Sequence, residues 1–90
     1  MNIKEEVLHF FKTNAIKPLP GDTEADYLAC YYLDIGIIDS IGIVKMIMEF
    51  EEKFNIHFDA ACMQSYEFQT VGGLIQIIER IRGEKNEQRA

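Results

Sequence analysis

The chain has 90 residues, 48% of them hydrophobic and 27% charged, and its formal net charge is −6 at pH 7. A chain of this length buries only about two-thirds of its unfolded surface, which excludes a deep active site with several walls. The negative charge argues against a nucleic-acid partner, because neutralising phosphates requires a basic stripe.

The first predicted element is a helix over residues 2–14. Asn2 is placed to cap it, with Glu5 three residues later, and apolar residues recur at helical spacing. Glu5 and Glu6 also stand where a signal peptide carries only positive charge, and no apolar run approaches the roughly 20 residues that span a bilayer. We therefore expect a cytoplasmic protein without a membrane span.

A long connection follows, over residues 15–38. A structureless loop of this length is unusual in a compact domain, so the segment is expected to have structure of its own. The sequence "TEAD" at 23–26 matches a helix-capping pattern and predicts a short helix near 24–33. Its aromatic residues are expected to lie on the core.

Two further main helices are predicted. One runs from about residue 40 to 54, with Asp39 as its N-cap. The other covers 71–82, and Arg80 and Arg82 are expected in its last turn, where cations favour the helix dipole.

The fold class expected from these elements is all-α. It is a small four-helix bundle of three main helices and one short helix, the short one near 59–66, and its long first loop has room for an extra short helix. The domain spans 1–82, and the polar residues 83–90 are expected to form a flexible C-terminal tail.

The helix over 40–54 has two apolar stripes on opposite sides. The stripe expected to face the core comprises Ile43, Met46, Ile47, Phe50 and Phe54. The second stripe comprises Ile41, Val44 and Met48. Either residues 15–38 cover it, or it is an exposed contact surface for a partner protein or a bound acyl chain.

Ser40, at the start of this helix, has three interpretations: part of a helix cap, a nucleophile, or an attachment point. A hydrolase is disfavoured, because "IIDSIGI" lacks the G-x-S-x-G elbow and His57 lies about 25 Å along the same helix. Attachment of a phosphate group is chemically suitable, since a helix N-terminus stabilises a phosphodiester.

Metal binding is not predicted. Cys30 and Cys62 stand far apart and outside any CxxC pair, and the two histidines, His9 and His57, have no metal-ligand spacing relative to them. Two buried, reduced thiols are expected.

The segments "GIIDSIGIVKMIMEFEEKFNIHF" (36–58) and "FQTVGGLIQII" (68–78) resemble the acyl carrier protein family, whose carrier domains bear phosphopantetheine. The signature is a Gly, one or two residues, Asp-Ser and a hydrophobic residue, then an amphipathic helix ending in Glu-Glu-x-Phe. It is matched by Gly36, Asp39-Ser40-Ile41 and Glu51-Glu52-Lys53-Phe54. The resemblance covers residues 2–82. The "GIIDS" spacing is more like stand-alone specialised, D-alanyl or peptidyl-type carriers than the housekeeping fatty-acid type.

The resemblance implies that Ser40 receives 4′-phosphopantetheine from coenzyme A, with Asp39 positioning the Mg²⁺-dependent transfer. The thiol would carry acyl or aminoacyl groups as thioesters in fatty-acid, lipid, polyketide or related biosynthesis. Partner enzymes would do the chemistry: a carrier-protein synthase (a phosphopantetheinyl transferase), a loading ligase or transferase, and downstream enzymes. The protein itself would be a non-catalytic monomer.

The partner interface predicted on this basis comprises Ile41, Val44, Lys45, Met48, Glu51 and Glu52. The alternative function is a small helical interaction or regulatory module that is never modified. Gly72 and Gly73, in the first turn of the last helix, are either tolerated there or leave space for the arm and its cargo.

Overall fold

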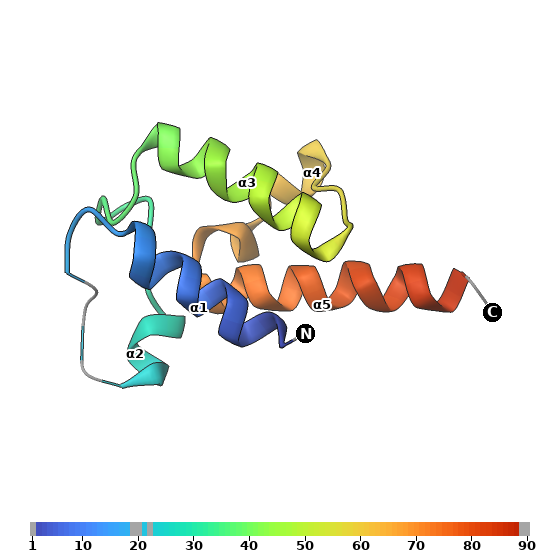
Figure 1. Cartoon of the computed structure of the whole chain (residues 1–90), viewed down its shortest axis with the longest axis horizontal. Coiled ribbons are helices and arrows are strands. Elements are labelled where there is room, and N and C mark those ends of the chain that lie inside the picture. The colour runs from blue at the N-terminus through green and yellow to red at the C-terminus, as the bar shows by residue number, and fades with distance from the viewer. Residues whose placement is uncertain (1, 19–20, 22, 89–90) are drawn as a thin grey trace.

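The computed structural model of the chain describes residues 2–18, 21 and 23–88. The elements are α1 (Ile3–Asn14), α2 (Glu24–Leu28), α3 (Ser40–Phe54), α4 (Ala60–Met63), the short 3₁₀ helix η1 (Tyr66–Gln69) and α5 (Val71–Gln88). Helix α5 runs along the length of the molecule, and it contacts α1, α2 and η1, while α1 also contacts α3 (Figure 1). The predicted all-α class is confirmed.

Helix starts follow the capping residues read from the sequence. Asn2 accepts a hydrogen bond from the Glu5 amide at 3.1 Å, so α1 begins where predicted. Thr23 and Asp26 form a reciprocal capping box, and the extra short helix in the first connection is therefore real. It ends at Leu28, earlier than predicted, because the chain then enters a series of turns up to residue 36.

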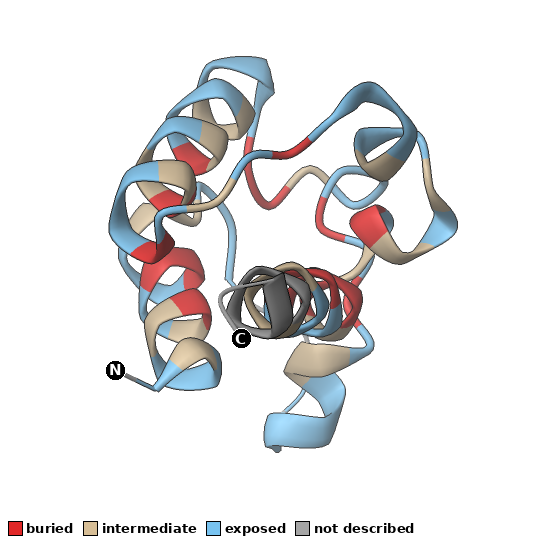
Figure 2. Cartoon of the chain, turned by 90° about the vertical axis from the view of Figure 1, so that its right-hand side faces the viewer, coloured by how far each residue is buried: buried red, intermediate tan, exposed pale blue. Residues whose placement is uncertain are grey.

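The core is formed by the inward faces of all three main helices together with the connection that precedes α3. Figure 2 shows the buried positions turned toward the space between the helices. The helices contribute Val7, Phe10, Phe11, Met46, Phe50, Phe54, Val71, Leu74, Ile75, Ile77 and Ile78. On α3 the predicted core stripe is confirmed at its centre, although Ile43 and Ile47 are only half-buried.

The connection before α3 is fixed to the core by its buried residues. Tyr32 is fully buried, its hydroxyl donates to the Phe68 carbonyl, and burial raises its pKa above the ordinary range of tyrosine. The Val71 amide donates to the Cys30 carbonyl at 3.2 Å, which joins the connection to the start of α5. The segment therefore packs toward η1 and α5 and leaves the outer side of α3 open.

Helix α5 is longer than expected. It continues to Gln88, so the predicted end at residue 82 is wrong, and Arg80 and Arg82 do not lie in its last turn. Arg80 pairs with Glu67 at 3.3 Å, and Arg82 donates to the Phe54 carbonyl at the end of α3. Within the described ranges, none of the helices is long and apolar enough to cross a membrane.

Candidate functional site

The site is built at the turn that leads into α3. Gly36 has φ of +73°, a conformation that glycine adopts without strain, and it reverses the chain just before the helix. Ile37 and Ile38 follow and are buried in the core, with only 1% and 2% of their surface exposed, so they fix the turn to the core. Asp39 and Ser40, the next two residues, are both exposed as a result.

Asp39 is the N-cap of α3, as predicted. Its Oδ1 accepts from the Gly42 amide at 2.8 Å, and its carbonyl accepts from the Ile43 amide at 2.9 Å. The structure assigns no hydrogen-bond partner within the described ranges to the amides of Ser40 and Ile41, the first two helical residues. These free N–H groups and the positive end of the helix dipole make the Ser40 hydroxyl a suitable place for an anionic group.

Both histidines have other contacts than Ser40. His57 lies at the opposite end of α3, where its Nδ1 is 3.2 Å from a Glu51 oxygen, and His9 contacts Thr13 on α1. The described contacts therefore give Ser40 no partner that would remove its proton.

An open apolar groove runs along α3 from Ser40. Its floor is the second stripe, Ile41, Val44 and Met48, whose side chains are 78%, 57% and 65% exposed. Its volume is about 690 Å³, and Lys45, Glu49 and Glu52 line it with the floor residues and Ser40. We call it the α3 groove. Residues 41, 44 and 48 are therefore exposed, and the connection before α3 does not cover them.

The predicted partner-interface residues divide into two sets. Five of them lie in the α3 groove: Ile41, Val44, Lys45, Met48 and Glu52. Glu51 does not, because its carboxylate accepts from the Phe58 amide at 2.9 Å and faces His57 instead. Glu49 lines the groove but is absent from the predicted set, although its position four residues after Lys45 places it on the same side of the helix.

Lys45 is held in a defined position at the edge of the groove. Its Nζ donates to Asn14 Oδ1 at 3.0 Å. The side-chain nitrogen of Asn14, Nδ2, donates in turn to the backbone carbonyl of Phe10 at 2.9 Å. Asn14 is the last residue of α1, so the lysine lies against the negative end of that helix. A sequence pattern cannot reveal this contact, which joins two helices.

The glycine pair at the start of α5 has a packing role that differs from both interpretations based on the sequence. A Cβ on Gly73 would lie 1.9 Å from the Glu67 carbonyl oxygen, and one on Gly72 would lie 2.9 Å from the Leu28 oxygen. Both neighbours are backbone, so α5 approaches η1 and α2 too closely for a larger residue. The glycines neither sit in a tolerant turn nor leave space for a bound group.

The cysteines offer no second site. Cys30 is buried, as predicted, while Cys62 is only half-buried, and both thiols are free. Burial raises the pKa of both, and the carboxylate of Asp59 adds to the effect at Cys62, so the reactive thiolate is disfavoured. Among the residues that the structure describes, no three His, Cys, Asp or Glu side chains lie together in a way that could hold a metal ion.

The chain is similar to known proteins over almost its whole length. No protein-family model matches it. A D-alanyl carrier protein of Leuconostoc citreum (strain KM20) is 26% identical over 83 residues, which are 92% of this chain and 100% of the relative. D-alanyl carrier proteins of Streptococcus pyogenes serotypes M5 (strain Manfredo) and M1 are 27% identical over 82 residues, which are 91% of this chain and 98% of each relative. The resemblance to the carrier-protein family is confirmed, and these relatives are of the D-alanyl type.

Proposed function

We propose that the chain is a carrier protein in which Ser40 bears 4′-phosphopantetheine, transferred from coenzyme A. One observation carries the proposal: an exposed serine follows a capping aspartate at the first position of α3 and opens onto an apolar groove. The relatives named above support the same role, since each is a carrier protein. The chain would act in the cytoplasm as a substrate of other enzymes and not as a catalyst.

The residues at the start of α3 suit this group. A phosphodiester on Ser40 would lie beside the free amides of Ser40 and Ile41, which need no dedicated cation to stabilise it. Asp39 uses one oxygen for the cap, and its exposed position leaves the other free to position the metal during transfer. The bound arm would supply a thiol that holds its cargo as a thioester.

The cargo we favour is an aminoacyl group. The basis is that the relatives named above are D-alanyl carrier proteins, together with the "GIIDS" spacing before α3. An acyl cargo in fatty-acid, lipid or polyketide synthesis is the second candidate. The unmodified interaction module, the alternative from another class, keeps the α3 groove as a docking surface but gives Ser40 no role beyond the helix start.

The α3 groove would be the surface that partner enzymes read. An enzyme that reaches the end of the arm must dock near Ser40, and the groove presents a bare apolar floor there. The partners would be the carrier-protein synthase, a ligase or transferase that loads the arm, and the enzymes that receive the cargo.

The proposal is tested by intact-mass measurement after incubation with coenzyme A, Mg²⁺ and a carrier-protein synthase of broad specificity. Wild type should gain the mass of one phosphopantetheine, and Ser40→Ala should gain none. Ser65→Ala is the matched control, because Ser65 is a second serine just outside a helix and should not affect modification. An unmodified wild type, or a modified Ser40→Ala protein, would contradict the proposal. Helical circular dichroism should show that both variants fold.

A further inference from the structure

The charged groups of the α3 groove are arranged by sign along its length. At the end near Ser40, the amides of Ser40 and Ile41 have no hydrogen-bond partner among the described residues, and Lys45 lies about one turn further on. This end therefore favours negative charge. Glu49 and Glu52 line the other end of the groove, which favours positive charge. One face of α3 thus presents an end suited to an anion and an end suited to a cation.

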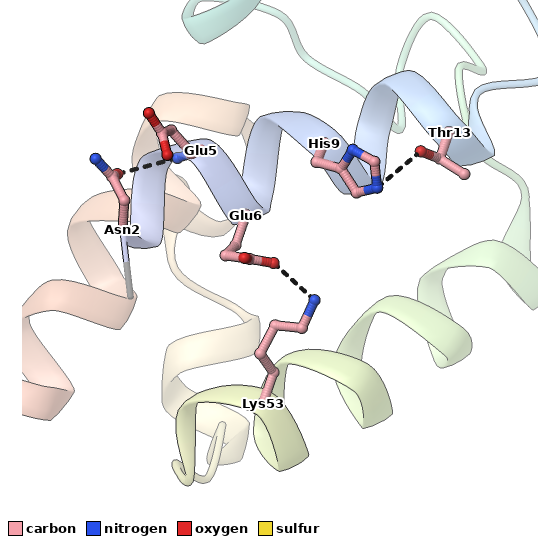
Figure 3. A network of polar contacts seen from close by, with 6 residues as sticks. All are labelled: Asn2, Glu5, Glu6, His9, Thr13 and Lys53. Carbon is pink, nitrogen blue, oxygen red and sulfur yellow. Dashed lines mark hydrogen bonds and ion pairs between the residues drawn. The ribbon is translucent and has the colours of Figure 1, made fainter.

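The two carboxylates of the groove are not neutralised by the lysines nearest to them in the sequence. Glu49 has a lysine four residues before it and another four residues after it, but both contact α1. Lys45 donates to the last residue of α1 at 3.0 Å, and Lys53 pairs with Glu6 at 2.7 Å (Figure 3). Neither Glu49 nor Glu52 takes part in an ion pair among the described residues. Both carboxylates can therefore accept a cation from outside the chain.

Glu49 is the better placed of the two carboxylates. It is half-buried, whereas Glu52 is exposed. It also lines a small hollow of about 140 Å³ between α1 and α3, which shares Lys45 and Glu49 with the α3 groove. Water and salt screen a partly buried carboxylate less than an exposed one, so it attracts a cation more strongly. Glu49 is therefore expected to make the main contact, with Glu52 beside it.

The distance from Ser40 to these carboxylates matches the length of a loaded arm. Because a helix rises about 1.5 Å per residue, Glu49 and Glu52 lie about 14 and 18 Å along the axis from Ser40. An extended chain covers about 3.5 Å for every three chain atoms, so a phosphopantetheine arm with about 13 chain atoms up to its sulfur spans about 15 Å. An aminoacyl thioester places its amino nitrogen about three atoms further, at roughly 19 Å. The amino group can therefore reach both carboxylates.

We propose that the loaded arm of the undocked carrier lies along the α3 groove, with the protonated amino group of an aminoacyl cargo paired with Glu49 and Glu52. The inference rests on the proposed function, because it assumes that Ser40 bears the arm. Charge and length together identify the occupant, since a phosphate and an ammonium roughly 19 Å apart complement the two ends of the groove. An acyl cargo lacks the cation, so the site favours aminoacyl groups. An enzyme that docks in the groove would displace the arm and receive its cargo.

The test compares two arms on ¹⁵N-labelled protein. A carrier-protein synthase of broad specificity would attach each arm from a coenzyme A analogue that has a stable amide in place of the thioester. One analogue carries an alanyl group, and the other an isobutyryl group, which has a methyl group in place of the ammonium. Relative to the isobutyryl arm, the alanyl arm should shift the amide signals of residues 48–52, and this difference should weaken as ionic strength rises. Intact mass verifies that each arm is attached.

The pKa of the alanyl amino group gives a second readout. Pairing with a carboxylate favours the protonated form, so this pKa should be about 0.5 higher on the protein than in free alanyl-pantetheine amide. Glu49→Gln/Glu52→Gln should remove most of the rise. Glu5→Gln/Glu79→Gln is the matched control, because it makes the same charge change at exposed positions outside the groove, and it should keep most of the rise. Carbon-13 labelling of the alanyl group allows the titration to be followed by NMR.

The outcomes separate the inference from the proposed function. A mass gain without the expected shifts would overturn the inference alone, whereas the absence of any mass gain would overturn both. Identical shifts from the two arms would mean that the ammonium makes no contact and would also overturn the inference. An equal fall of the amino-group pKa in the two double variants would overturn it too, because net charge would then explain the rise. The spectra themselves report whether each variant is folded.

Discussion

Arg82 on α5 donates a hydrogen bond from Nη1 to the carbonyl oxygen of Phe54, the last residue of α3, at 2.6 Å. The last four carbonyl groups of a helix have no partner within the helix, so an arginine from another element can satisfy one of them. Asn55 follows in the left-handed conformation with φ of 55°, which ends α3 at this point. The contact therefore fixes the end of the helix that carries the candidate site to the longest helix of the fold.

The first prediction concerns this contact. Arg82→Ala should lower the free energy of unfolding by about 1–2 kcal/mol, because a charged donor to a partly buried carbonyl is lost. Arg80→Ala is the control on the same helix, since its pair with Glu67 is 52% and 39% exposed and should contribute less than about 1 kcal/mol. Urea unfolding followed by circular dichroism measures both. A loss for Arg82→Ala no larger than that for Arg80→Ala would contradict a stabilising role of the contact with Phe54.

The second prediction concerns the two glycines of α5 that differ most in their surroundings. Gly73→Ala should destabilise the fold by about 1–3 kcal/mol or more, because its Cβ would overlap the Glu67 carbonyl. Gly83→Ala introduces the same methyl group where nothing lies within 4 Å, and it should raise stability by up to about 1 kcal/mol through helix propensity. Thermal unfolding midpoints that move in opposite directions would meet this expectation. A tolerated Gly73→Ala would mean that η1 is free to move away from α5.

The third prediction separates the two stripes of α3. Phe50 is 1% exposed, and Phe50→Ala should lower the free energy of unfolding by about 3–5 kcal/mol. Val44 is 57% exposed, so Val44→Ala should change stability by no more than about 0.5 kcal/mol while slowing modification of Ser40 by the carrier-protein synthase. Denaturant midpoints and the rate of mass gain give the two readouts. Comparable loss of stability in both variants would mean that Val44 contributes to the core in solution.

The helix starts were predictable because each depends on hydrogen bonds between residues that are close in the sequence. Asn2, Thr23 and Asp39 all accept the amide hydrogen bond three residues later that their side chains suggest. The position of Ser40 was predictable too, because the residue after the N-cap Asp39 is the first residue of α3. Local hydrogen bonds of this kind need no knowledge of the rest of the fold.

The remaining features depend on contacts between elements and could not be read from the sequence. Periodicity shows that α3 has two apolar stripes, but only the packing of residues 30–38 on the core, with Tyr32 buried, shows that the outer stripe is open. The role of Arg82 depends on the end of α3, and the position of Lys45 depends on Asn14. The positions of Asp39 and Ser40 at the start of α3 could therefore be predicted from the sequence, while the contacts of Lys45 and Arg82 could not.

The last prediction concerns the position of Lys45. In carriers of the housekeeping fatty-acid type, which the sequence resembles less, the corresponding helix is usually densely acidic, whereas here a cation, Lys45, lies beside the floor of the groove. A lysine that faces a basic docking patch is repulsive, and the hydrogen bond to Asn14 favours the position of Lys45 beside the groove. The phosphopantetheine form of the protein should therefore serve a general malonyl transferase or ketosynthase poorly.

Lys45→Glu should raise the rate several-fold, and Lys53→Glu, which makes the same charge change on the same helix but outside the groove, should raise it much less. Rates for the wild type equal to those of the enzymes' own carrier would contradict the idea that Lys45 selects against them. Equal gains from the two variants would show that net charge, and not the position of this one cation, governs the choice of partner.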